Sequence, residues 1–242
     1  TLAFWRWALQ PSVWVSTPGT LINLLLLIYV TGIPAWPLYL FLRMRQVNPQ
    51  LPVPAELRVA MVVTKAPSEP WELVQHTLLA ALTQAPTHDT WLADEQPSEA
   101  VRHWCQEHGV GLSSRAGVEA YHQPRWPRRT RCKEGNLAYF YDHYGYANYE
   151  VVVQLDADHI PQAGYLVAML QPFNDLRVGY VAAPSICNLN GDHIWAARGR
   201  LFAEAVLHGP MQLGCNGVFA PLCIGSHYAC LLYTSPSPRD RG

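Results

Sequence analysis

Two carboxylates, Asp156 and Asp158, stand one residue apart at the end of an apolar run, residues 151–155 (VVVQL). That run predicts a buried strand, and Pro161 opens a predicted helix. The carboxylates therefore lie at the carboxyl end of a strand, the edge at which open α/β sheets bind ligands. Paired carboxylates there suit Mg²⁺ or Mn²⁺, which commonly reach a protein already bridged to a diphosphate. The alternative is an ordinary turn, because Asp is common where strands end.

Two earlier strands also end in polar side chains. Thr64 follows the predicted strand 59–63, and Asp94 follows the predicted strand 90–93. The carboxyl ends of parallel strands share one edge of a sheet. We therefore expect Thr64, Asp94 and Asp158 to meet around a single ligand.

Apolar periodicity predicts the elements that carry these side chains. Runs of strand length alternate with segments of helical period, which indicates an α/β fold with a mostly parallel sheet and helices on both faces. The predicted strands are 59–63, 90–93, 110–114, 151–155 and 178–183, and the predicted helices are about 70–82, 98–108, 133–144, 161–170 and 193–208.

The first 45 residues have the composition of a membrane segment. Residues 1–20 hold three Trp around a single Arg, a mixture typical of the membrane–water interface. Residues 21–42 form a run without formal charge that is long enough for a transmembrane helix, although two prolines would kink it. Arg43 and Arg45 follow at once and favour the cytoplasmic side for the rest of the chain. The alternative for residues 21–42 is a buried helix of a soluble protein.

Composition narrows the classes of function. Charged residues make up only 14% of the 242, below the usual share of about 25%. The formal charge of -1 offers no basic surface for nucleic acid, which we exclude as a partner. Six cysteines without a Cys-x-x-Cys pair indicate reduced thiols of a cytosolic domain. Residues 46–57 are rich in proline and predict a stiff spacer between the membrane and a domain that starts at residue 58.

Five short motifs follow one another along the chain: VVT at 62–64, LADE at 92–95, KEGNL at 133–137, DADHIP at 156–161 and GCNGVF at 214–219. This ordered set resembles the processive, membrane-embedded family 2 glycosyltransferases, the group of bacterial cellulose synthase, over most of residues 1–229. The resemblance implies a GT-A-like domain that transfers a sugar, with inversion, from a UDP-sugar to a glycan acceptor. It also implies Mg²⁺ or Mn²⁺ as cofactor and a multi-pass protein of the inner membrane with a cytoplasmic catalytic domain.

The resemblance also assigns roles on the donor side. Thr64 and Asp94 would hold the nucleoside, with Asp94 accepting a hydrogen bond from an N–H of uracil. Lys133 would approach the donor phosphates, an assignment favoured because a cation at a helix start is otherwise mildly unfavourable. Asp156 and Asp158 would hold the diphosphate through the metal, with Asp158 the direct ligand.

On the acceptor side the resemblance assigns Gly214, Cys215 and Asn216. The family usually has Phe-Cys before this glycine, whereas this chain has Gln212 and Leu213.

Three other side chains lie close to these motifs in the sequence. Glu95 replaces the second Asp of the family pattern. His159 is expected to pack behind the carboxylates rather than to bind the metal. Arg115 could reach a phosphate, and a surface salt bridge is the simpler interpretation.

Four arginines in the segment 125–131 could meet anionic lipid headgroups or be solvated.

The end of the sequence has its own interpretation. Residues 230–240 (CLLYTSPSPRD) match one reading frame of a transposase-type sequencing adapter, so we expect residues 230–242 to be an artefact and the glycosyltransferase domain, 58–229, to be incomplete. The catalytic base of the family lies in a downstream Thr-Glu-Asp motif. We therefore expect this chain to bind a nucleotide sugar without elongating a polymer, and to have the lipid bilayer and further membrane subunits as partners.

Two other functions stay open. The departures at Glu95 and at Gln212 and Leu213 are compatible with a non-catalytic, membrane-tethered protein that binds nucleotide sugars. A metal-dependent phosphoesterase could use the same two carboxylates, although such enzymes usually have further metal ligands at other strand ends.

Overall fold

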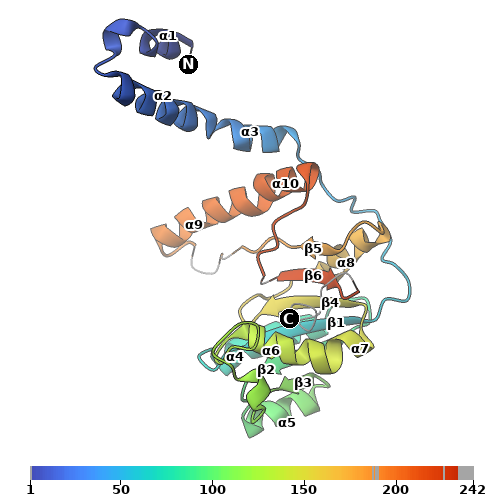
Figure 1. The fold of residues 1–242 in the computed structure, drawn as a ribbon. Helices are drawn as coiled ribbons and strands as arrows, with labels where there is room; N and C mark the ends of the chain where they lie inside the picture. Colours follow the sequence, from blue (N-terminus) through green and yellow to red (C-terminus); the bar gives the residue numbers. More distant parts are fainter. Residues whose placement is uncertain (1, 187, 189–190, 226, 234–242) are drawn as a thin grey trace.

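The computed structural model describes residues 2–186, 188, 191–225 and 227–233, arranged as a helical arm and a layered α/β domain (Figure 1). The arm holds the first elements of the chain, which are α1 (Leu2–Ala8), η1 (Pro11–Val13), α2 (Thr17–Gly32) and α3 (Ala35–Leu42).

Six strands form one sheet in the order β3-β2-β1-β4-β6-β5. Strands β1 to β4 run parallel, whereas β6 is antiparallel to both β4 and β5. The prediction of a mostly parallel α/β sheet is confirmed. The strands are β1 (Val59–Lys65), β2 (Asp89–Asp94), β3 (Gly111–Ser114), β4 (Val151–Asp156), β5 (Tyr180–Ala182) and β6 (His227–Leu231).

Strand β6 is absent from the sequence-based prediction. It crosses the predicted artefact boundary, since Cys230 pairs with Val152 of β4 and with Tyr180 of β5. The sequence-based assignment stopped at residue 229 and so left too few residues for a strand. That residues 230–242 are an artefact stays a prediction, and residues 234–242 lie outside the described part of the chain.

Alternation along the central strands supplies two separate cores. In β1, Val59, Met61 and Val63 face one hydrophobic cluster, whereas Ala60 and Val62 face another. Each fully buried large apolar side chain contributes about 1.5–3 kcal/mol. One cluster packs against α4 (Trp71–Leu82), α5 (Glu99–Glu107) and α8 (Tyr165–Leu170), and the other packs against α6 (Lys133–Phe140) with its continuation η3 (Tyr141–Gly145) and α7 (Tyr146–Asn148). Helices on both faces of the sheet are therefore confirmed.

Short connections complete the domain. They are η2 (Glu119–Tyr121) after β3 and η4 (Gln171–Asn174) after α8. Between β5 and β6 the chain forms α9 (Trp195–Val206), η5 (Leu207–Met211) and α10 (Gln212–Val218).

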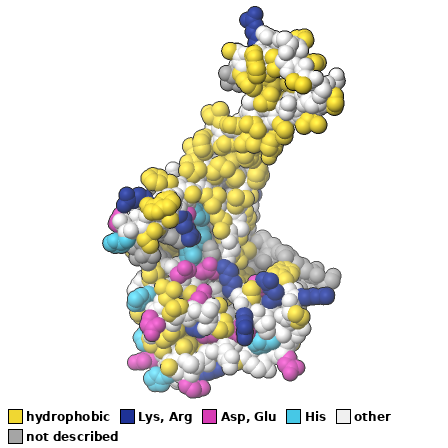
Figure 2. All heavy atoms as spheres, turned by 90° about the vertical axis from the view of Figure 1, so that its left-hand side faces the viewer, with side chains coloured by type: hydrophobic (Ala, Val, Ile, Leu, Met, Phe, Trp, Pro, Cys, Tyr) yellow, Lys and Arg dark blue, Asp and Glu magenta, His cyan; other side chains and the backbone are white. Residues whose placement is uncertain are grey.

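The arm contains one helical stretch, Thr17–Leu42, that is long and apolar enough to cross a membrane by length and composition. It has a mean hydropathy of 1.8 and is only 6% buried, whereas a core helix of a soluble protein would be covered. Hydrophobic side chains cover most of its surface in Figure 2. The helix is interrupted between Gly32 and Ala35, beside Pro34, where the sequence predicted a kink.

A buried arginine fixes the loop that follows β3. Arg115 is 0% exposed and its Nη2 lies 3.0 Å from Oε2 of Glu95, just past β2. Its Nε donates to Asn136 of α6 at 2.6 Å. The amide of Asn136 in turn donates to the carbonyls of Lys65 and Ala93, which ties β1 to β2.

The expectation of a surface salt bridge at Arg115 is therefore wrong, and the structure does not leave this guanidinium free for a phosphate. It also donates to the backbone carbonyls of Tyr121, Arg129 and Cys132. Gly135 makes room for it, because a Cβ there would collide with the guanidinium.

Replacing Arg115 with Met should destabilise the chain by about 3 kcal/mol or more, because the buried carboxylate of Glu95 would lose its compensating charge. The free energy of unfolding in mild detergent, measured with a denaturant, checks this. As a control, Arg102→Met alters a half-exposed partner of Glu99 on α5 and should change stability by less than about 0.5 kcal/mol. Equal effects of the two substitutions would contradict the assignment.

Candidate active site at the carboxyl edge of the sheet

The register of the parallel strands brings the predicted residues to one edge. Thr64 of β1 pairs with Asp156 of β4, and Lys65 pairs with Asp94 of β2. Asp158 follows two residues after Asp156 on the loop that leaves β4. The three strand ends therefore share one edge of the sheet, whereas a single ligand between them stays a prediction.

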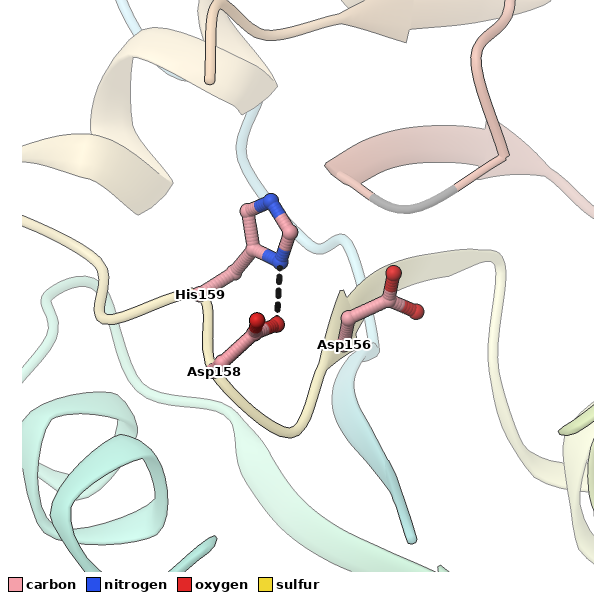
Figure 3. Close-up of side chains that lie close together, drawn as sticks. All are labelled: Asp156, Asp158 and His159. Carbon is pink, nitrogen blue, oxygen red and sulfur yellow. Dashed lines mark ion pairs between the residues drawn. The ribbon is translucent and has the colours of Figure 1, made fainter. Parts of the chain in front are cut away.

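Asp156, Asp158 and His159 form a group whose ligand atoms all lie within 4.8 Å of one another. Figure 3 shows Asp156 on the end of the strand and the other two side chains on the loop beyond it, with Asp158 facing His159. Oδ1 of Asp158 lies 3.1 Å from Nδ1 of His159. Thr77 of α4 holds this loop, since its hydroxyl donates to the carbonyl of Ala157 at 2.6 Å.

This donor set fits a divalent metal ion. Two carboxylates supply the hard oxygen ligands that Mg²⁺ and Mn²⁺ prefer, and an imidazole nitrogen is compatible with Mn²⁺. Asp158 is exposed, so an ion bound there could also bind a ligand from solution. The sequence analysis placed His159 behind the carboxylates, whereas the structure places it among the three candidate ligands.

Lys133, the first residue of α6, reaches the same group. Its Nζ lies 2.7 Å from Oδ1 of Asp156, and its side chain is partly exposed. The ammonium group thus lies beside the candidate metal ligands and remains accessible to an anion. Its approach to donor phosphates stays a prediction.

Asp94 is buried without full compensation. Its Oδ1 accepts a hydrogen bond from the backbone N–H of Gln96 at 3.0 Å, whereas its Oδ2 has no hydrogen-bond partner. The nearest cation to Oδ2 is Nζ of Lys65, at 3.6 Å. Burial raises the pKa of the Asp94 carboxyl group, and the Gln96 N–H and Lys65 only partly oppose that shift. Thr64, which pairs with Ala93, is also buried.

Lys65 is a residue that the sequence analysis missed. The sequence does indicate this residue, because a lysine directly after Thr64 places a cation at the end of a predicted strand. The extended register of β1 beyond the predicted end at residue 63 is what brings it opposite Asp94.

Two further histidines pack behind the candidate ligands. The ring of His159 stacks on His227 of β6 at 5.1 Å, and His208 of η5 lies 5.5 Å from His227. His159 also contacts the hydroxyl of Ser185 at 2.8 Å. Burial, reinforced by the neighbouring His159, His208 and Lys133, lowers the pKa of His227 to about 4. His227 is therefore neutral near pH 7, and its ring packs against that of His159.

The predicted acceptor residues lie on a helix between β5 and β6. Gly214, Cys215 and Asn216 belong to α10, which packs against α3 of the arm. The side-chain amide of Asn216 donates to the carbonyl of Arg45 at 3.0 Å. Within the described residues, no hydrogen bond or ion pair joins these three to the carboxylates of the sheet edge. Their acceptor role stays a prediction.

Comparison with known proteins supports the fold. No protein-family profile matches the chain, and no curated protein does. The structure is similar to that of the mannosyltransferase PcManGT from Pyrobaculum calidifontis, solved with GDP-Man and Mn²⁺, with a TM-score of 0.57 and 18% sequence identity. The similarity covers 84% of this chain and 55% of that one, so this chain spans about half the length of the mannosyltransferase.

A second solved structure has a lower score. Glucosyl-3-phosphoglycerate synthase from Mycobacterium tuberculosis, in complex with Mn²⁺, UDP and glucosyl-3-phosphoglycerate, gives a TM-score of 0.45 at 18% identity, over 73% of this chain and 57% of that one. At such identities the likeness concerns the fold, which is α/β and similar to that of a solved glycosyltransferase.

The raised pKa of Asp94 predicts a pH dependence of stability. A buried carboxyl group with a raised pKa binds its proton more tightly in the folded state, so it stabilises the folded chain at low pH and loses that contribution as the pH rises through the raised pKa. Wild type should therefore gain stability relative to Asp94→Asn as the pH falls from neutral toward the ordinary carboxyl value of 3.8, as measured by unfolding at several pH values.

Asp175 provides a control of opposite sign. Its hydrogen bonds from Arg177 lower the pKa of the exposed carboxyl group to about 2. Wild type should lose stability relative to Asp175→Asn as the pH falls through the ordinary carboxyl value of 3.8 toward about 2. The account of Asp94 is wrong if both substitutions show the same trend.

Proposed function

We propose that this chain is the donor-binding part of a membrane-bound, metal-dependent glycosyltransferase. The complete enzyme would transfer a sugar, with inversion, from a UDP-sugar to a glycan acceptor. The observation that carries the proposal is the candidate metal group of Asp156, Asp158 and His159 at the same sheet edge as Lys133 and Asp94. The fold, similar to that of a mannosyltransferase solved with GDP-Man and Mn²⁺, supports it.

Asp158, Asp156 and His159 would hold Mn²⁺ or Mg²⁺. When bound, such an ion offsets the negative charge that builds up on the departing diphosphate. Asp158 suits direct ligation because its carboxylate is exposed, whereas one oxygen of Asp156 is already engaged by Lys133. His159 is held in place by Ser185 and by stacking on His227, which orients its ring at the edge of the site.

The remaining donor residues bind and orient the nucleotide. The ammonium group of Lys133 would contact the diphosphate, adding a compact positive charge. The unpartnered Oδ2 of Asp94 suits an N–H donor such as that of uracil, since a buried acceptor without a partner is costly. Thr64 pairs with Ala93, the neighbour of Asp94 on β2, and the family resemblance assigns it to the nucleoside.

The proposal for the acceptor side is based on the position of α10. Gly214, Cys215 and Asn216 lie where α10 meets the end of the arm, which suits an acceptor that is associated with the membrane. Proton removal from the acceptor hydroxyl needs a carboxylate opposite the departing group. We assign that base to a segment outside this sequence, following the family resemblance.

The arm is proposed as a transmembrane anchor. Its exposed apolar stretch, Thr17–Leu42, has the length of a membrane span. Arg43 and Arg45 at its end favour a cytoplasmic sheet domain, and the complete protein would cross the inner membrane several times.

Two observations favour this function over the alternatives. Glu95, whose replacement of the family Asp left a non-catalytic role open, is the partner of the buried Arg115, so it has a structural reason to be there. Among the described residues, Asp156, Asp158 and His159 are the one group of three His, Cys, Asp or Glu side chains close enough to share an ion. A phosphoesterase with two metal ions would need more ligands.

Titration of the full chain in lipid nanodiscs with UDP tests the proposal. UDP should bind in the presence of Mn²⁺ and bind at least about tenfold more weakly after chelation, a loss of roughly 1.4 kcal/mol. Asp158→Asn should cause a similar loss with Mn²⁺ present and little change without it. The matched control, Glu107→Gln, removes an exposed carboxylate at the end of α5 and should leave UDP affinity unchanged. Wild-type affinity of Asp158→Asn for UDP with Mn²⁺ would refute the proposed metal site.

A further inference from the structure

Helix α9 has an inner and an outer face. Ala197, Leu201 and Glu204 recur every three or four residues and are partly covered by the rest of the chain. Trp195 and Phe202 recur at the same period on the opposite side and are 87% and 71% exposed. Val206, half exposed, continues this side by one turn. We refer to Trp195, Phe202 and Val206 as the α9 face.

Further exposed apolar side chains lie on the elements next to the α9 face. Ile194 precedes it and Leu207 follows it, and both are exposed. Phe219 and Leu222, just past α10, add two more exposed apolar side chains. Single exposed apolar residues are normal, whereas several on consecutive elements indicate a surface that another molecule covers.

The chain after α9 is attached to the end of the arm. Both η5 and α10 pack against α3. Gly214 and Gly217 allow this approach, since a Cβ at either position would collide with Leu40 or with the backbone of Arg43. The N–H of Arg45 donates to the carbonyl of Leu213 at 3.0 Å. Figure 1 shows α9 and α10 in line, between the arm and the sheet.

This attachment sets the level of α9 relative to a membrane. The apolar stretch ends at Leu42 and is followed by Arg43 and Arg45, so lipid headgroups would lie at the contact between α3 and α10. Helix α9 continues from that contact through η5. A helix that ends close to headgroup level and exposes large apolar side chains has lipid within reach.

The composition of α9 fits the boundary between lipid and water. Arg198 borders the α9 face, and Arg200 lies nearer the inner face, where it pairs with Glu204 at 2.6 Å; both arginines are exposed. Arginines beside a Trp and a Phe on one helix are typical of helices that lie in the membrane interface. A second copy of the chain is a weaker candidate, because a stable interface buries about 800 Å² on each partner, more than one short helix face supplies.

We propose that the α9 face lies on the lipid surface, with Trp195, Phe202 and Val206 in the boundary between headgroups and acyl chains. This contact is additional to the arm and rests on the proposed insertion of the arm. Its consequence concerns the site, because η5 carries His208, which packs against His227 behind His159. Two membrane contacts, one through α3 and one through α9, would hold the carboxyl edge of the sheet at a fixed height below the bilayer.

Fluorine NMR of the full chain tests this proposal in vesicles of phosphatidylcholine with added phosphatidylglycerol. A trifluoromethyl-phenylalanine is introduced at Phe202, a conservative change, or as a control at Leu79, an exposed residue of α4 on the sheet domain. The signal at position 202 should be lost with doxyl-labelled lipid and retained with a water-soluble gadolinium chelate. The signal at position 79 should show the reverse.

Three results would overturn the proposal. Loss of the position 202 signal with the gadolinium chelate, as at position 79, would show that the α9 face is in water. Retention with both agents would show that protein, such as a second copy, covers it. Release of the chain from the vesicles by alkaline carbonate would refute the membrane insertion of the arm as well, whereas the first two results leave that insertion intact.

Discussion

The parallel pairing of β1 with β2 and β4 is the constraint on which the rest of the structure depends. Its register puts Thr64 opposite Asp156 and Lys65 opposite Asp94, so residues up to 92 positions apart in sequence share one edge. A slip of one residue would turn every side chain of β1 to the other face of the sheet and remove both cores at once. The apolar alternation that stabilises the fold is thus the same feature that positions the candidate site.

The buried charges at the carboxyl edge of the sheet reduce the stability of the folded chain unless they are compensated. Asp94 keeps a buried oxygen without a hydrogen bond, and burial raises its pKa, so its ionised form opposes folding. Arg115 is also buried, but there every neighbour compensates it, through Glu95, Asn136 and three backbone carbonyls. One buried charge is therefore satisfied within the chain and supports the edge, whereas the other is only partly compensated, by Lys65 and by the N–H of Gln96. Such uncompensated groups are expected at functional sites rather than in supporting structure.

Much of the fold and of the candidate site could be predicted from the sequence, because the signals involved are local. Strands and helices with strong periodicity, and polar residues directly at strand ends, depend on local pattern and on one topological rule. Arg115 was misjudged because its burial depends on a loop and on Gly135, which no local pattern reveals. His208 and His227 come from a π-helical turn and an antiparallel strand near the chain end, and only tertiary pairing brings them behind His159. The packing of α10 on the arm was likewise invisible, because it depends on close approach at two glycines.

The central claim is that one nucleotide lies across the ends of β1, β2 and β4. Photo-crosslinking with 4-thio-UDP, followed by mass spectrometry of the digested chain, tests it most directly because the thio group marks the position of the base. The account predicts adducts on the strand ends around Thr64 and Lys65 or around Asp94, and it predicts that they require Mn²⁺. Adducts confined to the arm or to helices away from this edge, or adducts of equal yield after chelation, would contradict it.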